Sequence, residues 1–198
     1  MDESAVRDQY VRRYPLLLEL ADTLQANTLD ALAGVPHIDR VAFRAKSVDS
    51  FVAKSLDSKY KQPLSEIEDQ IAGRVITFFR DDIETVRAAL NSWFGAVERE
   101  TKEPSTPNEF GYESEHFVVV IQEHIKPTGW NDHPDMPNTF ELQVRTLFMH
   151  AWAEPQHDLG YKGSDIDRQT KRELAWIAAS AWGADKTLNE LAARLAKS

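Results

Sequence analysis

The chain has 198 residues, no cysteine and a formal net charge of −9 at pH 7. This length suits one domain with its own core, the absence of cysteine excludes a disulfide framework and thiolate catalysis, and the acidic balance argues against a broad nucleic-acid-binding surface. No run of 18 apolar residues occurs and the start, Met1-Asp2-Glu3-Ser4, is acidic, so we expect a soluble cytoplasmic protein without signal peptide or membrane span.

Hydrophobic periodicity and turn residues predict alternating helices and strands in the first half of the chain. Apolar residues at helical spacing end at Gly34 and Pro36, whereas β-branched and aromatic residues fill the segment from Gly73 to Phe79. The predicted elements are a helix over about 4–33 with Pro15 as a place for a kink or break, a strand over 38–46, a helix capped by Ser47 and running to about Tyr60, a loop containing Pro63, a strand over 73–79, and a helix capped by Asp81 or Asp82.

The second half continues the alternation and ends in a long amphipathic helix. The predicted elements are a strand near 96–100, a turn-rich loop over 104–108, a strand over 115–121, a second loop, a strand containing Glu141, a helix over about 146–157 and a helix over about 165–196. The apolar stripe of this last helix predicts packing against the first helix; the alternative is a subunit interface built from terminal helices, which would make a homo-oligomer.

The strand from Phe140 to Arg145 places polar side chains at alternate positions. Glu141, Gln143 and Arg145 share one face, and the apolar residues between them share the other. A strand with one solvated face shows the same alternation, so these residues alone leave open whether the polar face is a site or a solvent-exposed surface.

A basic motif, Arg44-x-Lys46-x-x-x-Ser50-x-x-x-Lys54, crosses a predicted turn from strand to helix. Arg44 and Lys46 point the same way at the strand end, while Ser50 and Lys54 share one helical face. Such a turn can gather cations, a hydroxyl and helical N–H groups around a polyphosphate, although a solvated helix face would have the same composition.

Two carboxylates and an aromatic turn complete the candidate set. Asp69 and Glu141 lie at the edges of two predicted strands, where a pair of carboxylates suits magnesium, although 32 acidic residues make an accidental pair common. Tyr112, after the permissive Gly111, offers a ring for stacking on a base, and His116 follows nearby. A loop anchor and a strand-edge histidine are the alternatives.

Together the motifs resemble the synthetase domain of the RelA/SpoT homology family, of the small alarmone synthetase type. The resemblance covers about residues 40–162 of what we expect to be one domain. It rests on five motifs, which are the basic motif above, Asp69-Gln-Ile-Ala-Gly-Arg74, Gly111-Tyr112-x-Ser114-x-His116, Phe140-Glu141-Leu-Gln143-Val-Arg145-Thr146, and the segment from Trp152 to Lys162.

The resemblance implies a mixed α/β fold of the nucleotidyltransferase type, with about five strands flanked by helices, and transfer of the ATP β,γ-diphosphate to the ribose 3'-hydroxyl of GDP or GTP. It assigns Arg44 and Arg74 to the adenine, Lys46, Ser50 and Lys54 to the triphosphate, Asp69 and Glu141 to magnesium (Mg2+), Glu141 also to the acceptor hydroxyl, and Tyr112, His116 and Gln143 to the acceptor. His157-Asp158 is an isolated dipeptide, so we expect no hydrolase activity.

Four positions depart from the guanine-specific pattern of the family. They are Asn108, Glu113, His150 and Gln156, of which His150 and Gln156 remain candidate acceptor contacts. Because these changes remove positive charge from the expected place of the acceptor 5'-phosphates, two alternatives stay open: a toxic relative that modifies the tRNA 3' end or an adenosine nucleotide, and a catalytically silent nucleotide-binding regulator. A basic patch of Arg7, Arg12, Arg13 and Arg40 would give tRNA little electrostatic help against the net charge of −9.

Overall fold

A computed structural model describes residues 2–95, 97–102, 110, 114–160 and 167–196, without the side chains of 97–99, 102 and 156–160. Its centre is a five-stranded mixed sheet in the order β1-β2-β5-β4-β3, in which only β2 and β5 are parallel neighbours. The strands are β1 (Ile38–Ala45), β2 (Ile71–Thr77), β3 (Val97–Lys102), β4 (Ser114–Val120) and β5 (Thr139–Thr146). The predicted fold class is confirmed.

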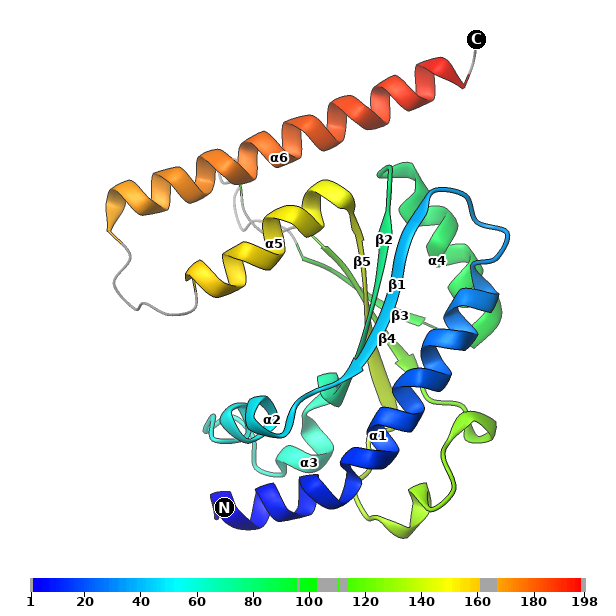
Figure 1. Cartoon of the computed structure of the whole chain (residues 1–198), viewed down its shortest axis with the longest axis vertical. Helices are drawn as coiled ribbons and strands as arrows, with labels where there is room; N and C mark the ends of the chain where they lie inside the picture. Colours follow the sequence, from blue (N-terminus) through cyan, green and yellow to red (C-terminus); the bar gives the residue numbers. More distant parts are fainter. Residues whose placement is uncertain (1, 96, 103–109, 111–113, 161–166, 197–198) are drawn as a thin grey trace.

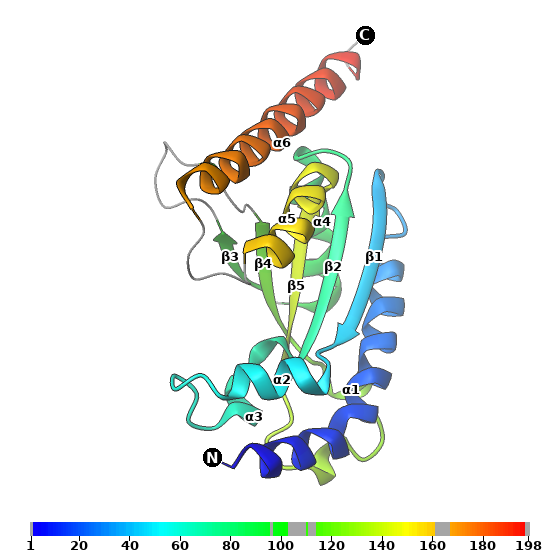
Figure 2. The ribbon, with the colours of Figure 1, turned by 60° about the vertical axis from the view of Figure 1, so that its left-hand side comes forward.

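The two faces of the sheet differ in polarity because side chains alternate along each strand. Phe140, Leu142 and Val144 of β5 are fully buried on the face covered by α1 and α4 (Figure 1). On the other face, Arg74 of β2 lies opposite Gln143 of β5. This polar face looks toward α5, and α2 and α3 lie beyond one end of the strands (Figure 2).

The helices frame the sheet on both sides. They are α1 (Glu3–Ala31), α2 (Val48–Ser55), α3 (Pro63–Glu66), α4 (Asp81–Phe94), α5 (Leu147–Gly160) and α6 (Arg168–Leu195), with short 3-10 turns at η1 (Glu68–Gln70), η2 (Glu123–Ile125) and η3 (Trp130–Asp132). In the part of the chain that the structure describes, no helix is both long and apolar enough to cross a membrane.

Helix α1 runs through Pro15 without a break. A proline inside a helix costs about 3 kcal/mol, but Tyr10, Leu17 and Leu20 are fully buried on both sides of it. Because each such side chain contributes roughly 1.5–3 kcal/mol on burial, packing against the sheet outweighs the missing hydrogen bond.

Three helix boundaries differ from the predicted ones. Ser47 does cap α2, since its Oγ accepts a hydrogen bond from the Ser50 amide at 3.3 Å, but α2 ends at Ser55. Pro63 does not lie in a loop and instead begins α3, where its missing N–H costs nothing. The cap of α4 is Arg80, because Asp82 points backward and its Oδ2 accepts a hydrogen bond from the Phe79 amide at 3.1 Å.

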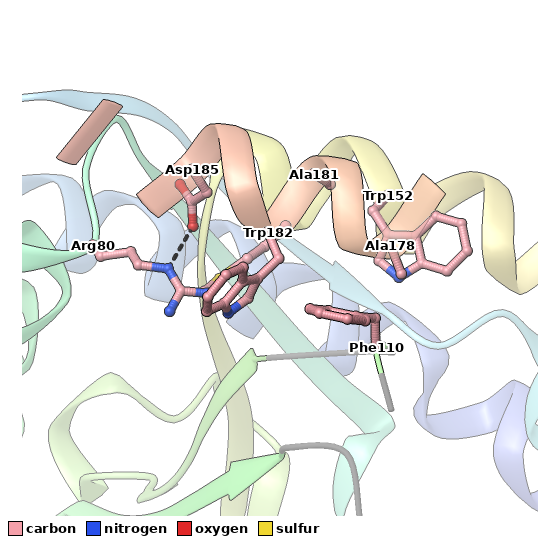
Figure 3. Close-up of a pocket in the computed structure, with 8 residues that line it drawn as sticks. Arg80, Phe110, Trp152, Ala178, Ala181, Trp182 and Asp185 are labelled. Carbon is pink, nitrogen blue, oxygen red and sulfur yellow. Dashed lines mark hydrogen bonds and ion pairs between the residues drawn. The ribbon is translucent and has the colours of Figure 1, made fainter. Parts of the chain in front are cut away.

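The prediction that the last helix packs against the first is wrong. Helix α6 lies along α5, away from α1 (Figures 1 and 2). One side of α6 is anchored by Asp185, 1% exposed, whose Oδ2 is 2.8 Å from Nε of Arg80, and by Trp182, whose ring meets that of Phe110 edge to face (Figure 3). Trp176 and Leu195 remain exposed, and the subunit interface stays a prediction.

Gly73 is required by packing on the apolar face. A Cβ at this position would lie 2.4 Å from two ring atoms of Phe43 and 2.7 Å from Cδ1 of Leu142. We therefore expect Gly73→Ala to destabilise the protein by about 1–3 kcal/mol through overpacking, measured by urea unfolding. Gly34→Ala is the control, because a Cβ there meets nothing within 4 Å. Equal stability of the two variants would contradict this assignment.

Candidate active site

The polar face of the sheet carries a cavity of about 760 Å³ that reaches from β1 across to β4. Its charged and polar lining residues are Arg44, Lys46, Asp69, Arg74, His116, Gln143, Arg145 and Glu154. Six of these residues belong to the set predicted from the sequence. The register of the strands brings them together. Arg44 of β1 pairs with Ala72 of β2, Arg74 of β2 pairs with Gln143 of β5, and Gln143 pairs with His116 of β4.

Asp69 lies in η1, directly before β2, and is held by two lysines. Nζ of Lys46 donates to Oδ2 at 2.8 Å and Nζ of Lys54 donates to Oδ1 at 3.0 Å. The Lys46 amide also donates to the Gln70 carbonyl at 2.8 Å, which ties the end of β1 to η1. Burial lowers the pKa of Lys54, but the hydrogen bond to Asp69 and the negative charge of Asp69, with smaller effects of Tyr60, together outweigh burial and raise the pKa. Lys54 therefore stays charged.

Glu141 lies on β5 beside His116 and Gln143. Its Oε1 is 3.3 Å from Nδ1 of His116 and accepts a hydrogen bond from Nε2 of Gln143 at 2.5 Å. Burial alone would raise the pKa of this carboxyl, yet the hydrogen bonds from His116 and Gln143 outweigh it and lower the pKa to about 2. Glu141 is thus an ionised carboxylate with restricted orientation.

Arg145 continues the polar row of β5 and is almost completely buried. Its Nη2 donates to Oε1 of Gln143 at 2.5 Å and its Nε donates to Oγ of Ser114 at 3.3 Å. Because the Gln143 carbonyl oxygen accepts from Arg145, its amide nitrogen is left to donate to Glu141. Alternation on β5 placed Arg145 on the correct face, but the sequence did not indicate this orienting contact.

Glu154 of α5 is a site residue that the sequence reasoning missed. Its Oε1 lies 2.8 Å from Nη1 of Arg74, 3.6 Å from Nη1 of Arg145 and 3.9 Å from Nδ1 of His150. Burial lowers the pKa of His150, and the charge of Arg74 lowers it further, so this imidazole favours its neutral form. No pattern in the sequence links a helical glutamate to arginines on two different strands.

The remaining predicted residues are placed as follows. Ser50 is exposed on α2, and the hydroxyls of Ser47 and Ser50 are hydrogen bonded at 2.8 Å. Lys54 reaches Asp69 without lining the cavity. His150 does not line the cavity either, but its Nδ1 lies 3.9 Å from Oε1 of Glu154, which does. Tyr112, Asn108 and Glu113 lie outside the described residues, as does the side chain of Gln156.

Residues 43–166 match the family described as the region found in RelA / SpoT proteins. The chain belongs to the RelA/SpoT family. It is 32% identical over 160 residues to GTP pyrophosphokinase YjbM of Bacillus subtilis, a match that covers 78% of this chain and 72% of that protein. The predicted family is therefore confirmed.

Solved structures agree with the fold of this RelA/SpoT family member. The crystal structure of small alarmone synthetase 1 from Bacillus subtilis superposes with a TM-score of 0.75 at 24% identity, over 96% of this chain and 100% of that chain. The same synthetase bound to its product pppGpp gives a TM-score of 0.72 at 23% identity, over 94% of this chain and 97% of that one. At these identities the likeness supports the architecture alone.

Proposed function

We propose that the protein is an alarmone synthetase that transfers the β,γ-diphosphate of ATP to the ribose 3'-hydroxyl of GDP or GTP, producing (p)ppGpp and AMP. One observation carries this proposal: a single cavity is lined by a lysine-held aspartate and three arginines, and two of its other lining residues, His116 and Gln143, hold the ionised Glu141 beside it. A relative 32% identical to this chain is named a GTP pyrophosphokinase, which supports the same activity.

The donor half of the proposed site lies on β1, β2 and α2. Arg44 and Arg74 line the cavity and offer planar guanidinium faces for stacking on adenine. Lys46, Lys54 and Ser50 would bind the triphosphate. The two ammonium groups that now neutralise Asp69 would turn to the phosphate oxygens.

Asp69 and Glu141 would hold magnesium. The residues fit such an ion, because Mg2+ is usually bound by one or two carboxylates together with substrate phosphates, and Asp69 already accepts two cationic groups. Within the described residues, no three histidine or acidic side chains converge to hold a metal by themselves, which agrees with binding that needs the nucleotide. When bound, the ion would neutralise charge that develops on the transferring phosphates.

The chain's own groups account for orientation and for the proton. Glu141 would accept the proton of the 3'-hydroxyl as the bond from the 3'-oxygen to the β-phosphorus forms. The bond between the β-phosphorus and the α,β-bridging oxygen breaks, and its electron pair leaves with AMP. His116 and Gln143 hold Glu141 in place before the acceptor arrives. Positioning and charge neutralisation supply most of the catalysis of phosphoryl-type transfer.

The test is incubation with γ-labelled ATP, magnesium and separate acceptors: GDP, GTP, GMP, ADP, AMP and tRNA. We expect label on the 3' position of GDP or GTP, with no release of pyrophosphate from the product. Label only on tRNA, or only on an adenosine nucleotide, would favour the toxin alternative. Tight ATP binding without AMP release would indicate the silent regulator.

The acceptor pocket can be tested through Tyr112 and Asn108. Stacking on an aromatic ring is worth about 1–3 kcal/mol per base, so Tyr112→Ala should raise the acceptor KM markedly for any base. Asn108→Lys should lower the KM of GDP or GTP by charge attraction to the 5'-phosphates, whereas a tRNA 3' end should gain little.

Steady-state kinetics at fixed ATP measures both effects. Asn131→Lys on an exposed turn is the control for the added charge. If Asn108→Lys and Asn131→Lys give the same acceptor KM, residue 108 is not near the acceptor phosphates.

A further inference from the structure

Glu154 contacts both the proposed ATP-binding part of the cavity, at Arg74, and the part next to Glu141, at Arg145. It is on α5, half exposed, while the two arginines that it contacts come from β2 and β5. Its carboxylate therefore bridges elements that are not adjacent in the sequence. Because His150 favours its neutral form, it does not form an ion pair with Glu154, and the cations that face this carboxylate are Arg74 and Arg145.

The contact with Arg74 fixes a guanidinium without covering it. The N–H bonds of a guanidinium lie in its plane, so an ion pair at Nη1, here 2.8 Å from Oε1 of Glu154, restrains the group and leaves its faces available for stacking. A long arginine side chain loses considerable rotamer freedom when it orders on a ligand. Restraint before ATP binds reduces that cost.

The contact with Arg145 affects the part of the site that contains Gln143 and Glu141. Arg145 is 4% exposed, and a buried cation requires a compensating charge. Glu154 supplies negative charge 3.6 Å from Nη1, while Nη2 of the same guanidinium fixes the carbonyl of Gln143. That bond makes the Gln143 amide donate to Glu141. The order of contacts is thus Glu154, Arg145, Gln143, Glu141.

We propose that Glu154 is a positioning residue for pyrophosphate transfer, which holds Arg74 ready for the adenine of ATP and, through Arg145 and Gln143, keeps Glu141 oriented toward the acceptor hydroxyl. This assignment rests on the proposed function. It adds a charged residue of α5 to the strands, η1 and α2 that carry the proposed donor and metal contacts.

The test compares Glu154→Ala, Glu154→Gln and the control Glu84→Gln, which removes the same charge from an exposed pair with Arg87 on α4. The non-hydrolysable analogue AMPCPP, with magnesium, is titrated by calorimetry, and kcat and KM are measured separately. Glu154→Ala should weaken AMPCPP binding about tenfold and lower kcat by about 10- to 100-fold, because misplaced reacting groups lose effective molarity.

Glu154→Gln should have an intermediate AMPCPP affinity, since its amide oxygen still accepts from Arg74, and a kcat near that of Glu154→Ala. Melting temperatures should fall only slightly, because Glu154 is half exposed and Arg145 keeps its hydrogen bonds to Gln143 and Ser114. Wild-type affinity and kcat in Glu154→Ala, or equal losses in Glu84→Gln, would overturn the proposal.

A double-mutant cycle with Arg74→Ala separates positioning from direct contact with the nucleotide. If Glu154 acts through Arg74, adding Glu154→Ala to Arg74→Ala should not weaken AMPCPP binding further. Fully additive losses would contradict this route. The cycle also stands apart from the proposed function: a wild-type protein that binds AMPCPP but labels no acceptor would refute the synthetase activity while the affinities still report on Glu154.

Discussion

Replacing Glu141 by alanine is expected to lower kcat of pyrophosphate transfer by roughly 10²- to 10⁴-fold while AMPCPP binding survives. The expectation follows from the place of Glu141 on β5, next to His116, because the adenine contacts that we propose come from Arg44 and Arg74. Single-turnover measurements with labelled ATP determine the rate, and calorimetry determines the affinity. Glu123→Ala, which removes an exposed glutamate paired with Lys126, is the control.

The pKa of Glu141 indicates whether this residue acts mainly as a base or mainly by orienting the acceptor hydroxyl and neutralising charge. At about 2 the carboxylate is ionised throughout the physiological range but is a weak base. We therefore expect orientation of the hydroxyl and charge neutralisation around the metal to contribute more than proton abstraction. Protonation of Glu141 should cause no fall in kcat/KM between about pH 8 and about pH 5. Near wild-type turnover in Glu141→Ala would exclude this residue from the reaction.

The strands and the faces of their polar side chains were predictable because they follow from periodicity within single elements, whereas the five-stranded mixed sheet and the grouping of these residues into one site were implied by the resemblance to the family. Alternation along β5 placed Glu141 and Gln143 on one face, and the strand-to-helix motif placed Lys46 and Lys54 at one turn. Local rules are sufficient where a side chain's direction depends only on its own element.

Contacts between elements were not predictable by the same rules. Glu154 reaches Arg74 because α5 packs over the polar face, and Asp185 reaches Arg80 because α6 lies along α5. The apolar stripe of α6 was visible in the sequence, but a stripe does not specify its partner, and the expected partner α1 proved wrong. The same limit applies to Pro15, whose cost is offset by burial that only the fold reveals.

Changing Asp69 to asparagine should have opposite effects on turnover and on metal-free nucleotide binding. Turnover should fall by at least about 10²-fold, because a proposed magnesium ligand is lost. Without metal, however, AMPCPP should bind more tightly than to wild type. The wild-type lysines must leave a carboxylate that accepts from them at 2.8 and 3.0 Å before they can hold phosphates. A hydrogen bond to a charged group is worth about 1.5–3 kcal/mol and one to a neutral group about 0.5–1.5 kcal/mol, so weakening these two bonds should improve the affinity at least about tenfold.

Calorimetry of AMPCPP in EDTA and in excess magnesium checks this reversal directly. Wild type should gain affinity on adding magnesium, whereas Asp69→Asn should gain much less. Asp49→Asn is the matched control and should behave as wild type. It removes an exposed carboxylate of α2 that pairs with Arg7 of α1. If Asp69→Asn bound AMPCPP more weakly than wild type in EDTA, Lys46 and Lys54 would not be phosphate ligands that Asp69 binds in the absence of nucleotide. The donor site would then have to be assigned to other cations of the cavity.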